Sequence, residues 1–385
     1  MNINFIIIKK SKQSLFIFRD CLLYITIVFF SFSCAKEIEK KQSRIPFILQ
    51  KVNDFTLNPP DSILFGKISS NAAISSSGEF LAFYDQIKKS VIVADTTGKI
   101  IRIFGSKGRG PKEFENIYAF NFDENDNIVV YDFELLRIKI FDINGNLLRI
   151  FAPEGEPSNH YIDASSLYAY NGFIYFGAID ANLIAFGDQK KPFWNSRLIA
   201  KYDYKGNLVE RMASYDNNLS KRDYYLTTPI IAIDTKTDRL FSTHMHYYGV
   251  QEFDLKTDTL ISKFGVQSES YRLVEEDKID FPSLMDKQKR IDFSTQQSYA
   301  ISLHASNKYV YVEYHNISED WYKAFDKSYK EYFLTVYDRN TKKYLSEIKL
   351  PFMLTAMNNN RVFLIENDNP DNYQIGSYEI VNPEL

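Results

Sequence analysis

Hydrophobic and polar residues alternate in short runs through most of the chain, and one arrangement of these runs recurs. Residues 80–104 and 127–151 each contain three alternating runs, separated first by a turn that carries Asp and then by an Asp-Gly turn. Runs of this period and length predict β-strands, and three in succession predict an antiparallel meander. Because a meander cannot bury its faces alone, its repetition predicts a radial or stacked array.

The two copies match position for position. Asp95 corresponds to Asp142, and Gly98 corresponds to Gly145. Weaker copies of the same turn follow further along the chain, at Asp203, Asp254 and Asp338. Five meanders that share one turn signature indicate that the repeat runs through the whole body of the protein.

A sixth copy begins near Met353 and stops one strand short. Residues 45–57 form a further alternating run that could supply the missing strand. We therefore expect an all-β fold, a six-bladed β-propeller with four-stranded antiparallel blades, closed by pairing of an N-terminal strand with the last blade. Such closure leaves no long open edge for another chain to pair with. The propeller domain would span residues 45–385.

The N-terminal segment predicts export. A short apolar run over residues 21–32 follows several basic residues, which is the pattern of a signal peptide spanning residues 1–33. The run ends in Ser33-Cys34, which resembles a bacterial lipobox, so Cys34 would be the lipidated first residue of the mature chain and residues 34–44 a linker. A plain signal peptide and an uncleaved anchor are the alternatives.

Composition agrees with a strand-rich exported body. The chain contains 27 Tyr and 31 Phe and is 45% hydrophobic, a bias typical of strands. Its net charge is only −3, so no nucleic-acid partner is expected, and membrane contact is expected through the lipid anchor only. Cys34 is the single cysteine left after processing, so no disulfide can form within the mature chain. No cofactor is predicted.

One stretch carries a resemblance to a known repeat. The Gly-rich connection FGSKGRGPKEF at residues 104–114 precedes a strand, a turn and a segment reading RIKIFDINGN. This order resembles one NHL-type propeller repeat, and Arg137, Phe141, Asp142 and Gly145 match its pattern. Together with the lipobox, the chain is similar to six-bladed propeller lipoproteins of the Bacteroidota. The resemblance implies the propeller fold and a cell-envelope location, anchored to the outer membrane on its periplasmic or its outer side.

Blade geometry separates two faces of the expected ring. With the strands of each blade named a to d from the centre outward, the b–c and d–a connections open on one face, here called the insertion face. The a–b and c–d turns open on the other, called the turn face. Residues 178–196 and 315–330 are insertions between strands b and c of blades three and five. They contain Phe193, Trp194, Trp321 and Tyr322.

These aromatic residues allow two interpretations. They could pack onto the blades and hold their own loops in place. Alternatively, aromatic side chains on one face could form a platform for a protein, peptide or glycan, because Trp and Tyr dominate binding hot spots. We expect the second role and assign Trp194 and Trp321, with Phe193 and Tyr322, to ligand binding.

A second set of candidates comes from the end of strand b. Alignment of the copies places six residues at one equivalent position, namely Asp85, Asp132, Gly177, His244, Glu313 and Glu366. Acidic residues there could bind a cation around the ring. They could also cap backbone amides of their own b–c turns, which is the commoner role of Asp in turns. We favour capping.

His244 and His246 form a separate pair. Two residues apart on a strand, they would share a face, as metal ligands or ligand-binding groups do. No third ligand stands at a matching spacing, so the sequence predicts no metal site and assigns the two histidines to ligand binding. The chain also lacks the nucleophile and phosphate-loop motifs of common enzymes.

These observations favour a lipid-anchored binding module of the cell envelope. A metal-dependent hydrolase or lyase on the same ring is the first alternative, and a structural subunit of an envelope complex is the second. A tightly bound metal after purification would favour the enzyme, and a co-purifying protein would favour the subunit.

Overall fold

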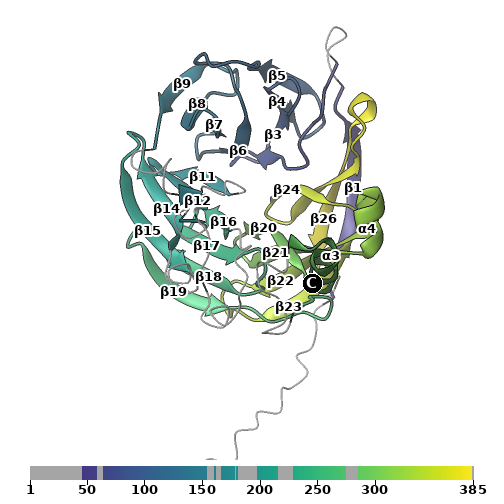
Figure 1. The fold of residues 1–385 in the computed structure, drawn as a ribbon. Coiled ribbons are helices and arrows are strands. Elements are labelled where there is room, and N and C mark those ends of the chain that lie inside the picture. Colours follow the sequence, from purple (N-terminus) through teal and green to yellow (C-terminus); the bar gives the residue numbers. More distant parts are fainter. Residues whose placement is uncertain are drawn as a thin grey trace, which may run out of the picture. The chain divides into compact units, whose positions relative to one another are not determined.

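The computed structural model describes residues 46–58, 64–153, 160–161, 166–177, 179–180, 197–215, 229–274 and 285–383. Within residues 45–385, six four-stranded antiparallel sheets form a ring (Figure 1), which confirms the predicted six-bladed propeller. Residues 1–44, with the predicted signal peptide, Cys34 and the linker, lie outside the described residues.

Five blades follow one another directly along the chain. Blade one has strands β2 (Ala73–Ile74), β3 (Phe80–Asp85), β4 (Ser90–Asp95) and β5 (Ile100–Phe104). Blade two has β6 (Ile117–Phe122), β7 (Ile128–Asp132), β8 (Arg137–Phe141) and β9 (Leu147–Phe151). Blade three has β11 (Leu167–Tyr170), β12 (Phe173–Gly177), β14 (Arg197–Asp203) and β15 (Leu208–Ser214). Blade four has β16 (Pro229–Asp234), β17 (Arg239–His244), β18 (Val250–Asp254) and β19 (Thr259–Phe264). Blade five has β20 (Tyr299–Ala305), β21 (Tyr309–Ile317), β22 (Lys330–Asp338) and β23 (Tyr344–Leu350).

The last blade combines the two ends of the described chain. It consists of β24 (Leu354–Asn358), β25 (Arg361–Asn367), β26 (Gln374–Val381) and, as its outermost strand, β1 (Ile48–Thr56). Strands β1 and β26 are antiparallel, so Ile48 lies opposite Val381 and Thr56 opposite Gln374. The predicted closure of the ring by an N-terminal strand is therefore confirmed.

The c–d turns explain why the repeat is clear in the early blades and faint in the later ones. In blades one to three a Gly takes positive φ, as at Gly98 (88°) and Gly145 (77°), and the preceding Asp side chain accepts hydrogen bonds from turn amides. In blades four and five the turn is one residue longer. Asp258 and Lys342 then take the left-handed position, with φ of 54° and 61°. The same hairpin geometry thus survives without the glycine that marks it in sequence.

Every outer strand carries a bulge. Against its neighbour, strand d of each blade has one extra residue, and the six are Val52, Ile101, Leu148, Val209, Ile261 and Leu345. In blades one to five the bulge lies at the same position of strand d, just after the c–d turn. A bulge increases local twist and interrupts a flat edge.

The core lies between the blades. Buried apolar side chains of the described residues form six clusters, one at each contact between neighbouring blades, including the contact between the last blade and the first. At the contact of blades one and two, the ring of Phe141 lies 4.9 Å from that of Phe104 and 5.7 Å from that of Phe114. Each blade is therefore stabilised on both faces by its neighbours.

Helices occur in the connections of the insertion face. Helix α3 (Lys287–Gln296) lies in the connection from blade four to blade five, and the Asp286 side chain caps it by accepting from the Lys289 amide at 2.9 Å. Helix α4 (Glu319–Ala324) and the 3₁₀ turn η4 (Lys327–Tyr329) fill the blade-five insertion, and η5 (Pro370–Asn372) joins β25 to β26. A small sheet of β10 (His160–Tyr161) and β13 (Ile179–Asp180) lies beside blade three. None of the helices in the described ranges is both long and apolar enough to cross a membrane.

Candidate functional site

The blade-five insertion presents its aromatic residues on a short helix. Acidic Glu319 and Asp320 occupy the first turn of α4, where they favour the positive end of the helix dipole. The helix ends at Phe325, which takes a left-handed conformation (φ 51°) and donates its backbone N–H to the Trp321 carbonyl at 2.7 Å. Phe325 itself is 70% exposed to solvent.

Trp321, Tyr322 and Phe325 form what we call the α4 aromatic cluster. The Trp321 ring contacts Tyr322 edge-on at 4.9 Å and Phe325 at 5.3 Å. The ammonium of Lys330 lies 4.9 Å from the Trp321 ring centre, a cation–π contact. None of the three aromatic residues belongs to an inter-blade cluster, so they contribute little to the packing of the propeller.

The partner residues expected in blade three are not described. Phe193 and Trp194 lie outside the described residues. The backbone of β13, in the same insertion, pairs with β10 in the preceding connection. The convergence of Trp194 and Trp321 on one binding surface therefore stays a prediction.

The two histidines of blade four have separate surroundings. Strand β17 ends at His244, and His246 lies in the turn that follows, so the two do not occupy one strand face. The His244 ring stacks on Tyr247 at 5.1 Å, whereas His246 packs edge-on against Tyr299 at 4.9 Å and against Phe293. Both imidazoles are at most 2% exposed. Their assignment to ligand binding stays a prediction, and the shared face on which it rested is not found.

The equivalent residues at the end of strand b divide into different roles. Asp85 accepts hydrogen bonds from the Ile87 and Lys88 amides of its own b–c turn, which is the capping role favoured from the sequence. Asp132 accepts from amides of the incoming connection, and Glu366 pairs with Lys51 of β1 at 2.9 Å. Glu313 alone among these residues lines the centre of the ring.

The centre of the ring is a channel of about 280 Å³. Its walls are the a strands of all six blades, whose labels β6, β11, β16, β20 and β24 stand toward the middle of Figure 1. Several polar wall side chains bond to the next blade; Asn121, for example, donates to the Leu167 carbonyl at 3.0 Å, and Ser166 accepts from the Ile231 amide. A further group of polar side chains lies on β20 and β21.

This group, which we call the channel cluster, consists of Ser302, His304 and Glu313. The Ser302 Oγ lies 2.6 Å from Glu313 Oε2 and 2.9 Å from His304 Nε2. The other carboxyl oxygen of Glu313 accepts from the Leu354 amide of blade six at 3.2 Å. One serine hydroxyl thus links a carboxyl group and an imidazole across the channel wall.

Burial shifts both titratable groups of the channel cluster toward their neutral forms. Glu313 is 1% exposed, and burial raises the pKa of its carboxyl to about 8. Burial likewise lowers the pKa of His304 to about 4. At neutral pH the cluster therefore presents a carboxylic acid, a hydroxyl and a neutral imidazole. Perturbed groups of this kind in a cavity mark a candidate functional site.

Sequence reasoning did not find Ser302 or His304, and it placed Glu313 in a ring of capping residues. On β20 the residues read as ordinary polar positions of a half-buried strand. The useful signal is that β21 carries an acidic residue in the middle of a long strand, four residues before its end at Ile317. An acid at that place cannot cap a turn.

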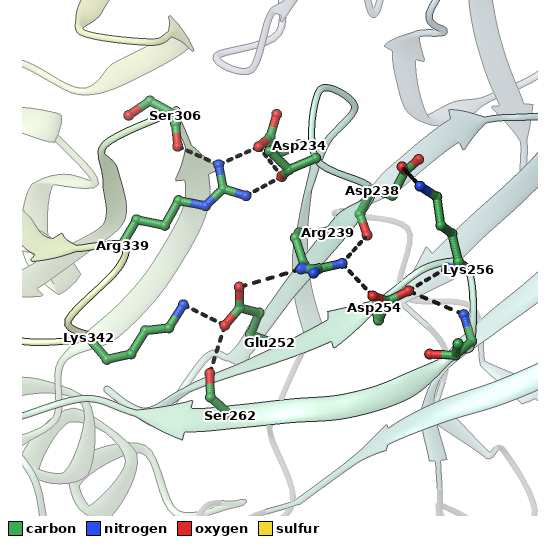
Figure 2. A network of polar contacts seen from close by, with 12 residues as sticks. Asp234, Asp238, Arg239, Glu252, Asp254, Lys256, Ser262, Ser306, Arg339 and Lys342 are labelled. Carbon is green, nitrogen blue, oxygen red and sulfur yellow. Dashed lines mark hydrogen bonds and ion pairs between the residues drawn. The ribbon is translucent and has the colours of Figure 1, made fainter.

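A polar network on the turn face of blades four and five differs from the channel cluster in charge balance (Figure 2). Arg339 donates to Asp234 and to the Ser306 carbonyl, and both charged side chains are 7% exposed. Arg239 contacts Asp254 at 2.6 Å, and further ion pairs join Lys256 to Asp238 and Lys342 to Glu252. The buried charges of this network are thus compensated, as expected of a structural tie between blades.

Within the described ranges, no group of three or more His, Cys, Asp and Glu side chains is placed to hold a metal ion. No family model and no curated protein matches the chain.

Two solved structures share the fold over most of this chain but have low sequence identity to it. A member of the DUF4221 family from Bacteroides vulgatus is 12% identical, with a TM-score of 0.64 over 88% of this chain and 99% of that one. A protein from Bacteroides fragilis described as exported is also 12% identical, with a TM-score of 0.56 over 87% of this chain and 96% of that one. At this identity the likeness shows a shared propeller fold.

Proposed function

We propose that the protein is an exported, lipid-anchored propeller of the cell envelope that binds a protein, peptide or glycan on its insertion face. The observation that carries this proposal is the α4 aromatic cluster. Its three aromatic side chains lie on a short helix and at its C-terminal end, outside the blade cores; Trp321 and Tyr322 are half-buried, and Phe325 lies largely in solvent. Aromatic side chains that lie at the surface and outside the packed core are typical of binding surfaces.

Export and anchoring are inferred from the N-terminal sequence. The basic segment, the apolar run and Ser33-Cys34 have the order of a lipoprotein signal. The likeness to a Bacteroides protein described as exported agrees with this inference. Replacement of Cys34 by Ser should leave the protein in the aqueous phase of a detergent partition, whereas the wild-type chain should enter the detergent phase.

Photo-crosslinking tests the binding surface. A photoreactive phenylalanine analogue placed at Tyr322 should crosslink to a discrete partner in cells, and the same analogue at Leu148 on the outer edge of blade two should not. Trp321→Ala, in the Tyr322 analogue background, should abolish the crosslink. For a glycan ligand, arrays probed with the mature wild-type chain and with Trp321→Ala give the equivalent comparison. Equal crosslinking from both positions, or no binding on arrays and no crosslink, would contradict the proposal.

A further inference from the structure

The wall of the channel carries many hydrogen-bond donors and acceptors but few uncompensated charges. Each a strand is the inner edge strand of its sheet, so its free edge turns backbone N–H and carbonyl groups toward the channel. These groups donate and accept in alternation along the wall. A hydroxyl group both donates and accepts, so it matches such a wall better than a group that can only accept.

The acidic residues around the channel are already neutralised or engaged within the protein. Asp234 is paired with Arg339, and Asp123 accepts from the Asn125 and Asn127 amides of its own turn. Lys236 stands exposed at the turn-face mouth. Glu313 has no cationic partner among the described residues, and its carboxyl group contacts a hydroxyl and an amide instead.

One wall hydroxyl has no partner. The Oγ1 of Thr355, on β24 of blade six, is buried (the residue is 5% exposed) and makes no hydrogen bond within the described residues. The residue lines the channel and directly follows Leu354, whose amide contacts Glu313. Because the Oγ1 atom has less than 1 Å² of accessible surface, a ligand would reach it only after a small movement of the wall, and the ligand would then supply the missing hydrogen bond.

The volume sets the size of the ligand. About 280 Å³ is close to the lower limit of roughly 300–1,000 Å³ for small-molecule sites. At about 30 Å³ per water, the channel holds roughly nine waters, or one molecule of about a dozen non-hydrogen atoms.

We infer that the central channel is a binding site for one small uncharged polyhydroxylated molecule, a monosaccharide or polyol. Ser302, His304, Glu313 and Thr355 recognise its hydroxyl groups. A free carboxylate or phosphate would meet no cation at this depth, and an amine would meet no ionised carboxylate. The site is distinct from the α4 aromatic cluster and does not depend on it.

Saturation-transfer NMR on the mature protein tests this inference with D-glucitol, D-galactose and myo-inositol as neutral probes. D-gluconate and Ca²⁺ serve as charged probes, the latter followed by calorimetry. At least one neutral probe should receive saturation, and Thr355→Val and Ser302→Ala should each reduce its affinity at least five-fold.

Two controls keep the test decisive. Thermal melts establish that each variant is folded, and Thr355→Val, which preserves shape, reports on the site even if Ser302→Ala unfolds. Trp321→Ala should leave polyol binding unchanged, so failure of the proposed function and failure of this inference are distinguishable. The inference is wrong if no neutral probe binds, if binding ignores both Thr355→Val and Ser302→Ala, or if Ca²⁺ alone binds and Glu313→Gln abolishes it.

Discussion

The turn-face network and the channel cluster are two buried polar groups of this propeller. They contain similar side chains but differ in how far positive and negative charges compensate each other. Around Arg339 a carboxylate faces a guanidinium, and the pair is held by further hydrogen bonds to backbone and side chains. Around Glu313 a carboxyl group faces a hydroxyl and an amide, and no cation in the described part of the chain compensates it. In the first arrangement opposite charges compensate each other, whereas the second leaves a buried carboxyl group without an opposite charge among the described residues. Charge balance therefore separates the scaffold from the candidate site better than burial does.

The largest expected effect is in the network. Arg339→Met leaves Asp234 buried without its cation, which should lower the free energy of unfolding by about 3–5 kcal/mol. Urea denaturation measures the loss. The double variant Arg339→Met with Asp234→Asn removes the stranded charge and should recover much of the stability. A loss below about 1 kcal/mol in the single variant would mean that the ion pair does not hold the blades together.

The channel cluster should show itself in the pH dependence of stability. Because burial raises the pKa of Glu313 from 4.5 to about 8, its contribution is full below pH 4.5 and is lost as the pH rises through 8. Burial lowers the pKa of His304 from 6.5 to about 4, so the contribution of His304 is present above pH 6.5 and is lost as the pH falls through 4. Between pH 4.5 and 6.5 both groups change the stability, and their effects have opposite signs.

Above pH 6.5 only the Glu313 dependence remains. The wild-type protein should therefore lose up to about 2 kcal/mol of stability between pH 6.5 and 8, relative to Glu313→Gln. Denaturation at several pH values measures both proteins. Parallel curves for the two would mean that the carboxyl group is ionised throughout, and the contrast with the network would disappear.

A smaller effect is expected from two ion pairs between neighbouring blades, here called ties. They occupy equivalent positions, and the positive and negative partners are exchanged between them. Lys201 in strand c of blade three contacts Asp258 in the next blade's c–d turn, and Glu252 at the equivalent place contacts Lys342 one blade further. In each tie the strand residue is 6% exposed and the turn residue 24%. Lys342→Met and Asp258→Asn should each cost about 1 kcal/mol, since the pairs are only partly screened. A cost above about 3 kcal/mol in either variant would mean that these pairs stabilise the blades as strongly as the Arg339–Asp234 pair does.

The smallest effect on stability is expected at the α4 aromatic cluster. Trp321→Ala should change the free energy of unfolding by less than about 0.5 kcal/mol, as for surface substitutions in general. Phe141→Ala is the matched aromatic control, and as a fully buried inter-blade residue it should cost about 3–5 kcal/mol. If both variants melt alike, Trp321 belongs to the core and the insertion face loses its aromatic site.

Sequence alone predicts the ring well, because its signals are local. Alternation fixes the strands, and Gly98 and Gly145 mark turns whose geometry requires positive φ. The signal weakens where Asp258 and Lys342 take the same geometry without a glycine. Even the closure by β1 could be predicted, because the last blade lacked a strand and the first residues supplied one.

The channel cluster could not be predicted in this way. Ser302 and His304 alternate along β20 like any solvent-facing polar residues, and nothing local indicates that their side is the centre of a ring. Contact with Glu313 depends on the register of two strands, and contact with Leu354 depends on the next blade. The role that we propose for Thr355 likewise depends on the assembled ring. Recognition of this site therefore requires the complete set of long-range contacts.

The position of β1 has a consequence for the order of events during biogenesis. The strand that leaves the ribosome before all other blades' strands must wait for β26, more than three hundred residues later, before it finds its hydrogen-bonding partner. Until then both the last blade and β1 expose unpaired strand edges, which makes an incomplete chain prone to aggregation. Closure of the ring therefore depends on the presence of the whole chain, because the first and the last strands of the propeller complete one sheet.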